Sequence, residues 1–128
     1  MSFDIFLQGF RDGAGTPGDQ AAAIAIITPL LAGPISGGYG RIVTADGEAD
    51  LYGLGDSDEG LMVNRASGHQ IWQVIVDIAR AAGYVVLPVG CPACVVDEVA
   101  IGHLPDELRE AAVLVHDGGD LELLVLSA

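Results

Sequence analysis

The chain has 128 residues, and 18 acidic against 5 basic side chains give it a formal net charge of −13 at pH 7. A chain of this length typically forms one domain and buries a core without needing disulfides or metal. Because 51% of the residues are hydrophobic, the high charge does not indicate disorder. The charge does argue against nucleic acid and anionic membranes as partners, since it repels both.

The sequence also gives an expectation of where the protein works. It starts without the basic and then apolar segments of a secretory signal. Its most apolar run, 21–32, contains Thr28-Pro29 and is about half the roughly 20 residues that a membrane-spanning helix needs. The two cysteines are too few for the disulfide framework of a small secreted protein. We therefore expect a soluble, cytoplasmic protein with a single domain over residues 1–128.

In chain order, the first predicted element is a strand at 3–8, where apolar and polar side chains alternate. A loop rich in glycine follows over 13–18. Thr16-Pro17 or Asp19 then begins a helix, because proline is tolerated in the first turn and a short polar side chain caps free N–H groups. Pro29 is expected to shorten or bend this helix.

The next segment is predicted as a β-hairpin with strands at 39–45 and 48–52. Asp46-Gly47 lies between them, and this pair favours the positive φ angles of a type I′ turn. An acidic loop over 55–60 then separates the hairpin from a short strand that begins at Leu61.

The clearest helical pattern covers 68–82, where apolar residues recur at helical spacing, with Ser67 as the expected cap and Gly83 as the stop. The apolar run 84–89 predicts a strand that is covered on both faces. Together with a strand at 61–65, these elements predict a right-handed β-α-β unit with parallel strands.

The last third is less regular. A short helix is predicted over 104–110 and a strand over 112–116, whereas 121–126 fits either a strand or a helix capped by Asp120. The order of elements predicts an α+β fold. We expect a ferredoxin-like variant sandwich, with a mixed sheet of five to six strands and two main helices on one face.

Cys91-Pro-Ala-Cys94 is the motif with the most direct chemical meaning. It follows a predicted strand, as redox-active Cys-x-x-Cys motifs do. The two carboxylates that follow it would raise the pKa of a thiol, which disfavours redox chemistry. Zinc would need His69, His103 or His116 to complete the site, and the sequence has no second cysteine pair. We favour two structural thiols and expect no cofactor, with a redox or zinc site on Cys91, Cys94 and His103 as the alternative.

Acidic residues gather between 46 and 59. Their spacing is not that of a calcium loop, which needs five or more oxygen ligands at fixed positions. The sequence also lacks a Gly-x-Ser-x-Gly elbow, a phosphate loop and a dinucleotide motif, so we expect no catalytic residues. The acidic residues are instead predicted to bind a cationic protein partner. They are Asp46, Glu48, Asp50, Asp56, Asp58 and Glu59.

Three segments resemble a group of small bacterial proteins of unassigned function: residues 1–10, residues 82–88 and His103-Leu104-Pro105. Proteins of this group look like immunity proteins of polymorphic toxin systems, the small cytosolic partners that neutralise toxin domains. The resembling motifs are structural, so the resemblance assigns no functional residue, and Cys91-Pro-Ala-Cys94 departs from the pattern of the group. Complementary charge also speeds association between an acidic inhibitor and a basic toxin. We therefore expect a non-catalytic protein that neutralises a toxin domain by occlusion.

Overall fold

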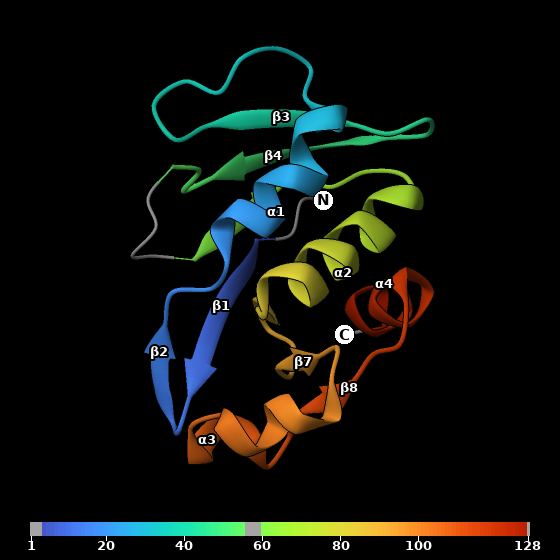
Figure 1. The fold of residues 1–128 in the computed structure, drawn as a ribbon. Coiled ribbons are helices and arrows are strands. Elements are labelled where there is room, and N and C mark those ends of the chain that lie inside the picture. Colours follow the sequence, from blue (N-terminus) through green and yellow to red (C-terminus); the bar gives the residue numbers. More distant parts are fainter. Residues whose placement is uncertain (1–3, 56–59, 128) are drawn as a thin grey trace.

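The structure is a computed structural model that describes residues 4–55 and 60–127. Within these ranges, eight strands form one mixed sheet, which confirms the predicted α+β class (Figure 1). The strands are β1 Ile5–Arg11, β2 Ala14–Thr16, β3 Gly40–Val43, β4 Glu48–Tyr52, β5 Leu61–Asn64, β6 Val85–Pro88, β7 Cys94–Val95 and β8 Val113–Leu114. The helices are α1 Gln20–Ile27, α2 Gln70–Ala82, α3 Asp106–Arg109 and α4 Gly118–Leu126, with 3₁₀ turns η1 Thr28–Leu30 and η2 Glu98–His103.

The strands are ordered β3-β4-β5-β1-β6-β7-β8, and β2 pairs with β1. All neighbours are antiparallel except β7 and β8, which are parallel. Strands β5 and β6 both run antiparallel to β1, so they are parallel to each other with β1 between them. The unit β5-α2-β6 is therefore a split β-α-β unit, as in ferredoxin-like folds.

The sheet has more strands than the five to six predicted. Strands β2 and β7 have three and two residues; β2 lies in the predicted loop over 13–18, and no strand is predicted at β7. Such short strands have no measurable alternation of apolar and polar residues, so periodicity does not detect them. Backbone pairing to β1 and β6 defines them instead.

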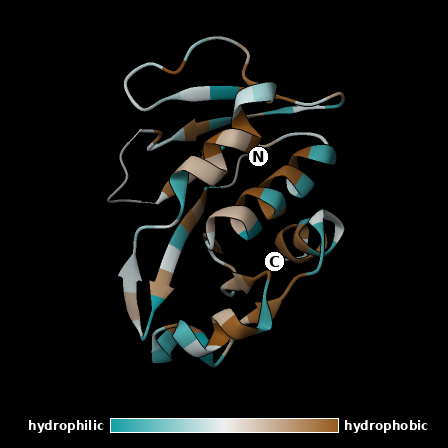
Figure 2. Cartoon of the chain, in the orientation of Figure 1, coloured by the Kyte–Doolittle hydropathy of each residue, from teal (hydrophilic) through white to brown (hydrophobic). Residues whose placement is uncertain are grey.

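Helices α1, α2 and α4 cover one face of the sheet (Figure 1), so one helix more than predicted lies there. Helix α2 alternates between apolar and polar residues along its length (Figure 2), and its apolar side, including Trp72, is buried. Gly83 ends α2 in the left-handed conformation, with φ of 75°. The largest core cluster of the protein lies between these three helices and the sheet.

The other face of the sheet is only partly covered. A second, smaller core cluster joins the β6–β7 end to η2 and includes Val85, Val95 and Leu104. The outward side chains of β3, β4, β5 and the first half of β1 have no such cover, because they are exposed or only half-buried.

Three local predictions were wrong: the turn type of the hairpin, the cap of α2 and the cap of α4. Asp46 and Gly47 do not have positive φ angles, so the hairpin connection is not a type I′ turn. Helix α2 begins without a cap from Ser67, whose hydroxyl instead contacts the backbone of Glu48. Helix α4 forms at 118–126 and is capped by Asp117 rather than Asp120. Its position beside α2, where Leu121 and Val125 are buried, selects helix over strand.

Candidate functional site

The uncovered part of the sheet is the surface that we call the open face. It is formed by the outward side chains of four neighbouring strands. These side chains are Asp4 with Phe6 and Gln8 of β1, Met62 and Asn64 of β5, Glu48, Asp50 and Tyr52 of β4, and Arg41 and Val43 of β3. Their inward neighbours on the same strands are buried in the main core, as the two-residue period of a strand requires.

An apolar row crosses the open face at right angles to the strands. Tyr52 is the register partner of Met62, Met62 is the partner of Phe6, and Phe6 is the partner of Leu87 on β6. The ring of Tyr39 extends the row, with its centroid 5.2 Å from that of Tyr52. Phe6 and Tyr52 are 44% and 41% exposed, so a large aromatic area faces solvent. Contiguous exposed apolar area of this kind is typical of interaction surfaces.

A polar row runs beside the apolar one. The side chain of Asn64 donates a hydrogen bond to Asp4, and the hydroxyl of Tyr39 donates to Asp50 at 2.6 Å. The bond to Asp50 raises the pKa of Tyr39, because the neutral phenol is the donor. Arg41 is the register partner of Asp50 at the β3 end of this row. The open face therefore combines an apolar centre with a polar flank, which is the usual composition of a protein–protein interface.

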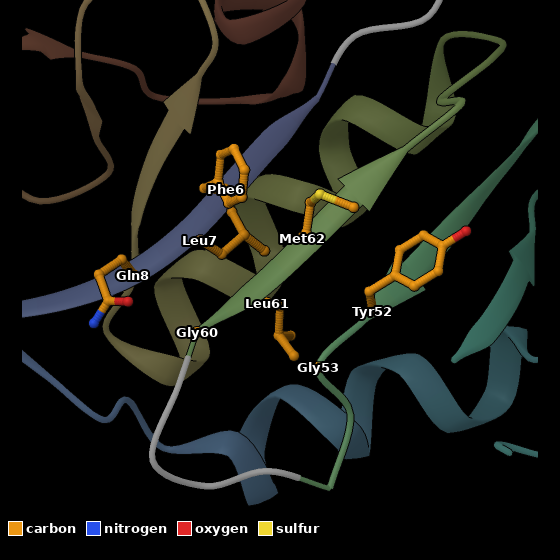
Figure 3. Close-up of a pocket in the computed structure, with 8 residues that line it drawn as sticks. All are labelled: Phe6, Leu7, Gln8, Tyr52, Gly53, Gly60, Leu61 and Met62. Carbon is orange, nitrogen blue, oxygen red and sulfur yellow. The ribbon is translucent and has the colours of Figure 1, made fainter. Parts of the chain in front are cut away.

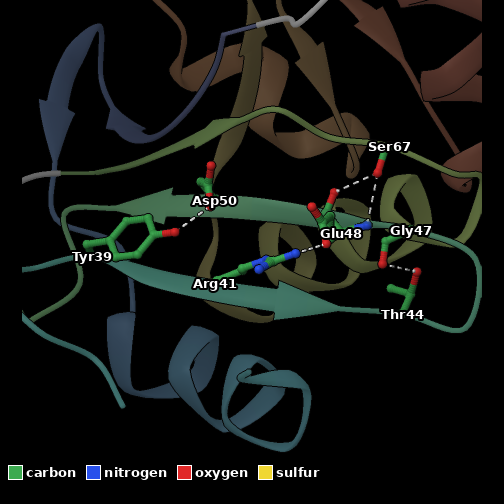
Figure 4. Close-up of polar contacts among 7 residues, drawn as sticks. All are labelled: Tyr39, Arg41, Thr44, Gly47, Glu48, Asp50 and Ser67. Atoms are coloured by element: carbon green, nitrogen blue, oxygen red, sulfur yellow. Dashed lines mark hydrogen bonds and ion pairs between the residues drawn. The ribbon is translucent and has the colours of Figure 1, made fainter. Parts of the chain in front are cut away.

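The three predicted acidic residues within the described ranges all have partners inside the molecule, and Figure 4 shows those of Glu48 and Asp50. Glu48 forms an ion pair with Arg41, and the two side chains are about half exposed. Asp50 accepts the Tyr39 hydroxyl. Asp46 lies off the open face, on the β3–β4 connection, where it accepts backbone N–H groups of α2. The structure thus places Glu48 and Asp50 on one face and Asp46 elsewhere.

The other three predicted acidic residues, Asp56, Asp58 and Glu59, lie outside the described residues. The apolar row was missed by the sequence analysis. Its signal was present, because the alternation that places Ile5 and Leu7 inside places Phe6 on the opposite face. What the sequence did not show was that none of the helices in the described ranges covers this part of that face.

A shallow pocket of about 510 Å³ lies alongside the apolar row (Figure 3). It is lined by Phe6, Leu7, Gln8, Tyr52, Gly53, Gly60, Leu61 and Met62. Its volume falls within the range of pockets that take ligands or partner side chains. Gly53 and Gly60 contribute no side chains, so backbone and the side chains of the row form its walls.

The side-chain amide of Gln8 has a fixed orientation at the edge of this pocket. Its Nε2 donates to the carbonyl oxygens of Gly9 and Thr16, at 3.1 and 3.0 Å. Its Oε1 therefore turns the other way and lies 3.1 Å from the position that a Cβ on Gly60 would take. The oxygen accepts no hydrogen bond from the part of the chain that the structure describes. A fixed, unused acceptor thus faces the pocket (Figure 3).

The Cys-x-x-Cys motif has a different environment from a reactive thiol pair. Cys94 is fully buried in β7, and this burial raises the pKa of its thiol to about 12. Redox and zinc chemistry both need the thiolate, which burial disfavours here. Cys91 is half-buried, and both thiols are free. Among the described residues, no group of three His, Cys, Asp or Glu side chains is arranged to hold a metal ion.

The histidines form surface contacts between elements. His69 Nδ1 lies 2.6 Å from Glu122 Oε2 on α4, and this contact raises the pKa of His69. His103, the third residue of the alternative metal site, instead accepts the backbone N–H of Asp12 at 3.3 Å. These contacts link distant elements, and neither lies on the open face.

Comparison with protein-family models, curated proteins and solved structures found no match. Within the described ranges, no helix has both the length and the apolar character needed to cross a membrane.

Proposed function

We propose that this chain is a non-catalytic binding protein that occludes a cationic protein with its open face, most simply as an immunity protein that neutralises a toxin domain. The observation that carries the proposal is the apolar row Tyr52-Met62-Phe6-Leu87, which crosses four strands. Its two aromatic side chains, Phe6 and Tyr52, are exposed to solvent. Exposing these side chains to water is unfavourable, and a partner that covers them removes that cost.

Charge indicates the kind of partner. The open face carries three carboxylates, of Asp4, Glu48 and Asp50, against the one guanidinium of Arg41. The whole chain has a net charge of −13, so its field attracts a basic protein and speeds the encounter. A second copy of the chain is a poorer occupant, because two molecules of this charge repel each other.

The sequence resemblance to immunity-like proteins points in the same direction. An immunity protein acts by occupying a surface, so it needs an interface and no catalytic group. The aromatic residues of the open face would form the centre of that interface, where tyrosine and other large side chains contribute most of the binding energy. The carboxylates would form its polar rim.

The test begins with capture of partners from a lysate of the source organism on the immobilised chain, followed by their identification and purification. Each purified partner is then titrated with the wild-type chain and with Phe6→Ser and Tyr52→Ser variants. Loss of a central aromatic anchor is expected to weaken binding by about tenfold to a hundredfold. The matched control is Leu123→Ser, which removes a side chain that is 70% exposed on α4, away from the open face.

Two results would overturn the proposal. One is a partner whose affinity is unchanged in both open-face variants, or falls equally in Leu123→Ser. The other is a stable dimer, shown by light scattering and broken by Phe6→Ser, since the open face would then be covered by a second copy. A toxin activity that is inhibited by the wild-type chain and restored by the open-face variants would support neutralisation.

A further inference from the structure

We propose that the pocket alongside the apolar row is the binding site for an arginine side chain of the partner. This inference rests on the proposed function, because it identifies the residue that the partner places on the open face. It depends on the apolar walls of the pocket, on the fixed side-chain acceptor of Gln8 and on the carboxylates of the same face.

The walls fit the stem and the head of an arginine. Phe6 and Tyr52 stand on the outer strands of the pocket, and Met62 lies on the strand between them (Figure 3). Aromatic faces attract cations, and the planar guanidinium stacks on them more readily than an ammonium does. Met62 is a flexible, polarisable side chain that adapts to the methylene stem.

The polar end of the pocket selects a donor. Oε1 of Gln8 can only accept a hydrogen bond, and its own Nε2 is already used by Gly9 and Thr16. A ligand group that carries only donors therefore fits, whereas a carboxylate or phosphate does not. Guanidinium has five N–H donors and no acceptor, so it can bond Gln8 while it stacks on a ring.

The surrounding charge favours a cation over a neutral amide. Asp50 is two residues before Tyr52 on β4, and Asp4 is two residues before Phe6 on β1, so both carboxylates project from the same face as the pocket. Arg41, the basic residue of the open face, is already paired with Glu48. The carboxylates of Asp4 and Asp50 lie on the same face, across the apolar row from Gln8, and neither forms an ion pair with a basic side chain of the described chain.

The inference is tested with N-acetyl-arginine amide as the probe, titrated into the isotopically labelled full chain and followed by NMR. Chemical-shift changes are expected at the side-chain amide of Gln8 and at the backbone of Gly53, Gly60 and Met62. The uncharged citrulline analogue, which has nearly the same shape, is expected to bind at least about tenfold more weakly. The lysine analogue, which lacks the planar head, is also expected to bind more weakly.

Two variants connect the probe to the pocket. Gln8→Leu removes the acceptor and Tyr52→Leu removes the ring, and each is expected to reduce arginine binding several-fold. Gln8→Leu also removes the hydrogen bond from Gln8 to Thr16 of β2, so it can loosen that strand. Tyr52→Leu leaves this bond in place and keeps an apolar side chain at position 52, so it tests the pocket independently. Leu123→Ala on α4 is the control and should bind the probe as the wild type does.

Equal binding of the arginine and citrulline probes, or of the arginine and lysine probes, would overturn the inference. So would shift changes that lie outside the pocket or persist in both variants. If a captured partner needs Phe6 and Tyr52 while the arginine probe does not bind, the inference fails and the proposed function stands. If partner binding is independent of the open face, the proposed function itself fails.

Discussion

The carboxylate of Asp46 accepts the backbone N–H of His69, with 2.8 Å between Oδ2 and the nitrogen. Its other oxygen accepts the N–H of Gln70 at 3.2 Å and the hydroxyl of Thr44 at 3.1 Å. The first N–H groups of a helix have no partners within the helix, and its N-terminus favours a negative charge. An acidic residue of the hairpin thus supplies the cap that α2 lacks, and fixes β3 and β4 of the open face relative to the helical layer.

Replacing Asp46 with alanine is expected to lower the melting temperature of the chain by several degrees, because two N–H groups at the start of α2 lose their acceptor. The hydrogen bonds from the backbone hold the pKa of Asp46 below its ordinary value of 3.8, the bond from His69 most of all. The carboxylate therefore stabilises the fold above that value, and the contribution is lost as the pH falls through the lowered pKa. Thermal melts of the wild type and of Asp46→Ala should show that the difference between their melting temperatures becomes smaller from neutral to acid pH. The control variant Glu110→Ala should melt like the wild type at every pH.

Gly47 is expected to tolerate no side chain, although its φ angle is not positive. A Cβ at this position would overlap the carbonyl oxygen of Ser67, so the hairpin would have to move away from the segment before α2. Gly47→Ala should lower the free energy of unfolding by roughly 1–3 kcal/mol or more, as overpacking does. Denaturant unfolding measures this, with Gly102→Ala as the control, since a Cβ there meets nothing within 4 Å. Equal stability of the two variants would contradict the close approach of the hairpin to the segment before α2.

The contact of His69 with Glu122 is expected to make the docking of α4 depend on pH. Glu122 raises the pKa of His69 above its ordinary value of 6.5, mainly through their hydrogen bond. The contact therefore stabilises the fold fully below pH 6.5 and is lost as the pH rises through the raised pKa of His69. Because His69 is largely exposed, the effect should decrease with salt.

This pH dependence can be measured by NMR titration of His69 together with hydrogen exchange of the α4 amides. In Glu122→Gln the pKa of His69 should fall toward its ordinary value. The protection of the α4 amides against exchange should then no longer decrease as the pH rises through the raised pKa that His69 has in the wild type. An unchanged pKa in the variant would show that the two side chains do not interact in solution.

The two cysteines are expected to differ strongly in reactivity. Cys94 is fully buried with a pKa raised to about 12, whereas Cys91 is half-buried, so a thiol reagent at neutral pH should modify Cys91 first. Titration of the native chain should detect one reactive thiol, and unfolding in guanidinium chloride should release the second. In Cys91→Ser the fast reaction should disappear. Rapid modification of both thiols in the native state would instead favour the redox or zinc alternative.

The sequence determined the elements that depend on local patterns. The helical spacing of apolar residues predicted α2, and Gly83 predicted its end, since only glycine adopts the left-handed conformation there at little cost. Asp19 was one of two predicted starts of α1, and it caps the helix through the N–H of Ala22. The alternation around Ile5 and Leu7 predicted which side of β1 is buried. These features follow from contacts within a few residues, so the local sequence contains the information.

The net charge of −13 was likewise fixed by composition, but the location of a binding surface was not. The acidic residues that drew attention in the sequence include Asp46, Glu48 and Asp50, and each has a partner within the fold. Charge clusters in the sequence do not show which carboxylates are already used, because their partners come from other strands and helices.

Only the tertiary structure decided which part of the sheet remains uncovered. Whether Phe6, Met62 and Tyr52 face solvent or a second layer depends on where η2 and α3 pack, and these elements lie 34 or more residues after the open-face strands in the chain. Their apolar residues join the β6–β7 end of the sheet and leave the other strands exposed. The register that aligns four separate strands into one apolar row is likewise set by backbone pairing across the sheet. The sequence thus determined the charge and the buried side of each strand, while long-range packing decided where the protein is open to a partner.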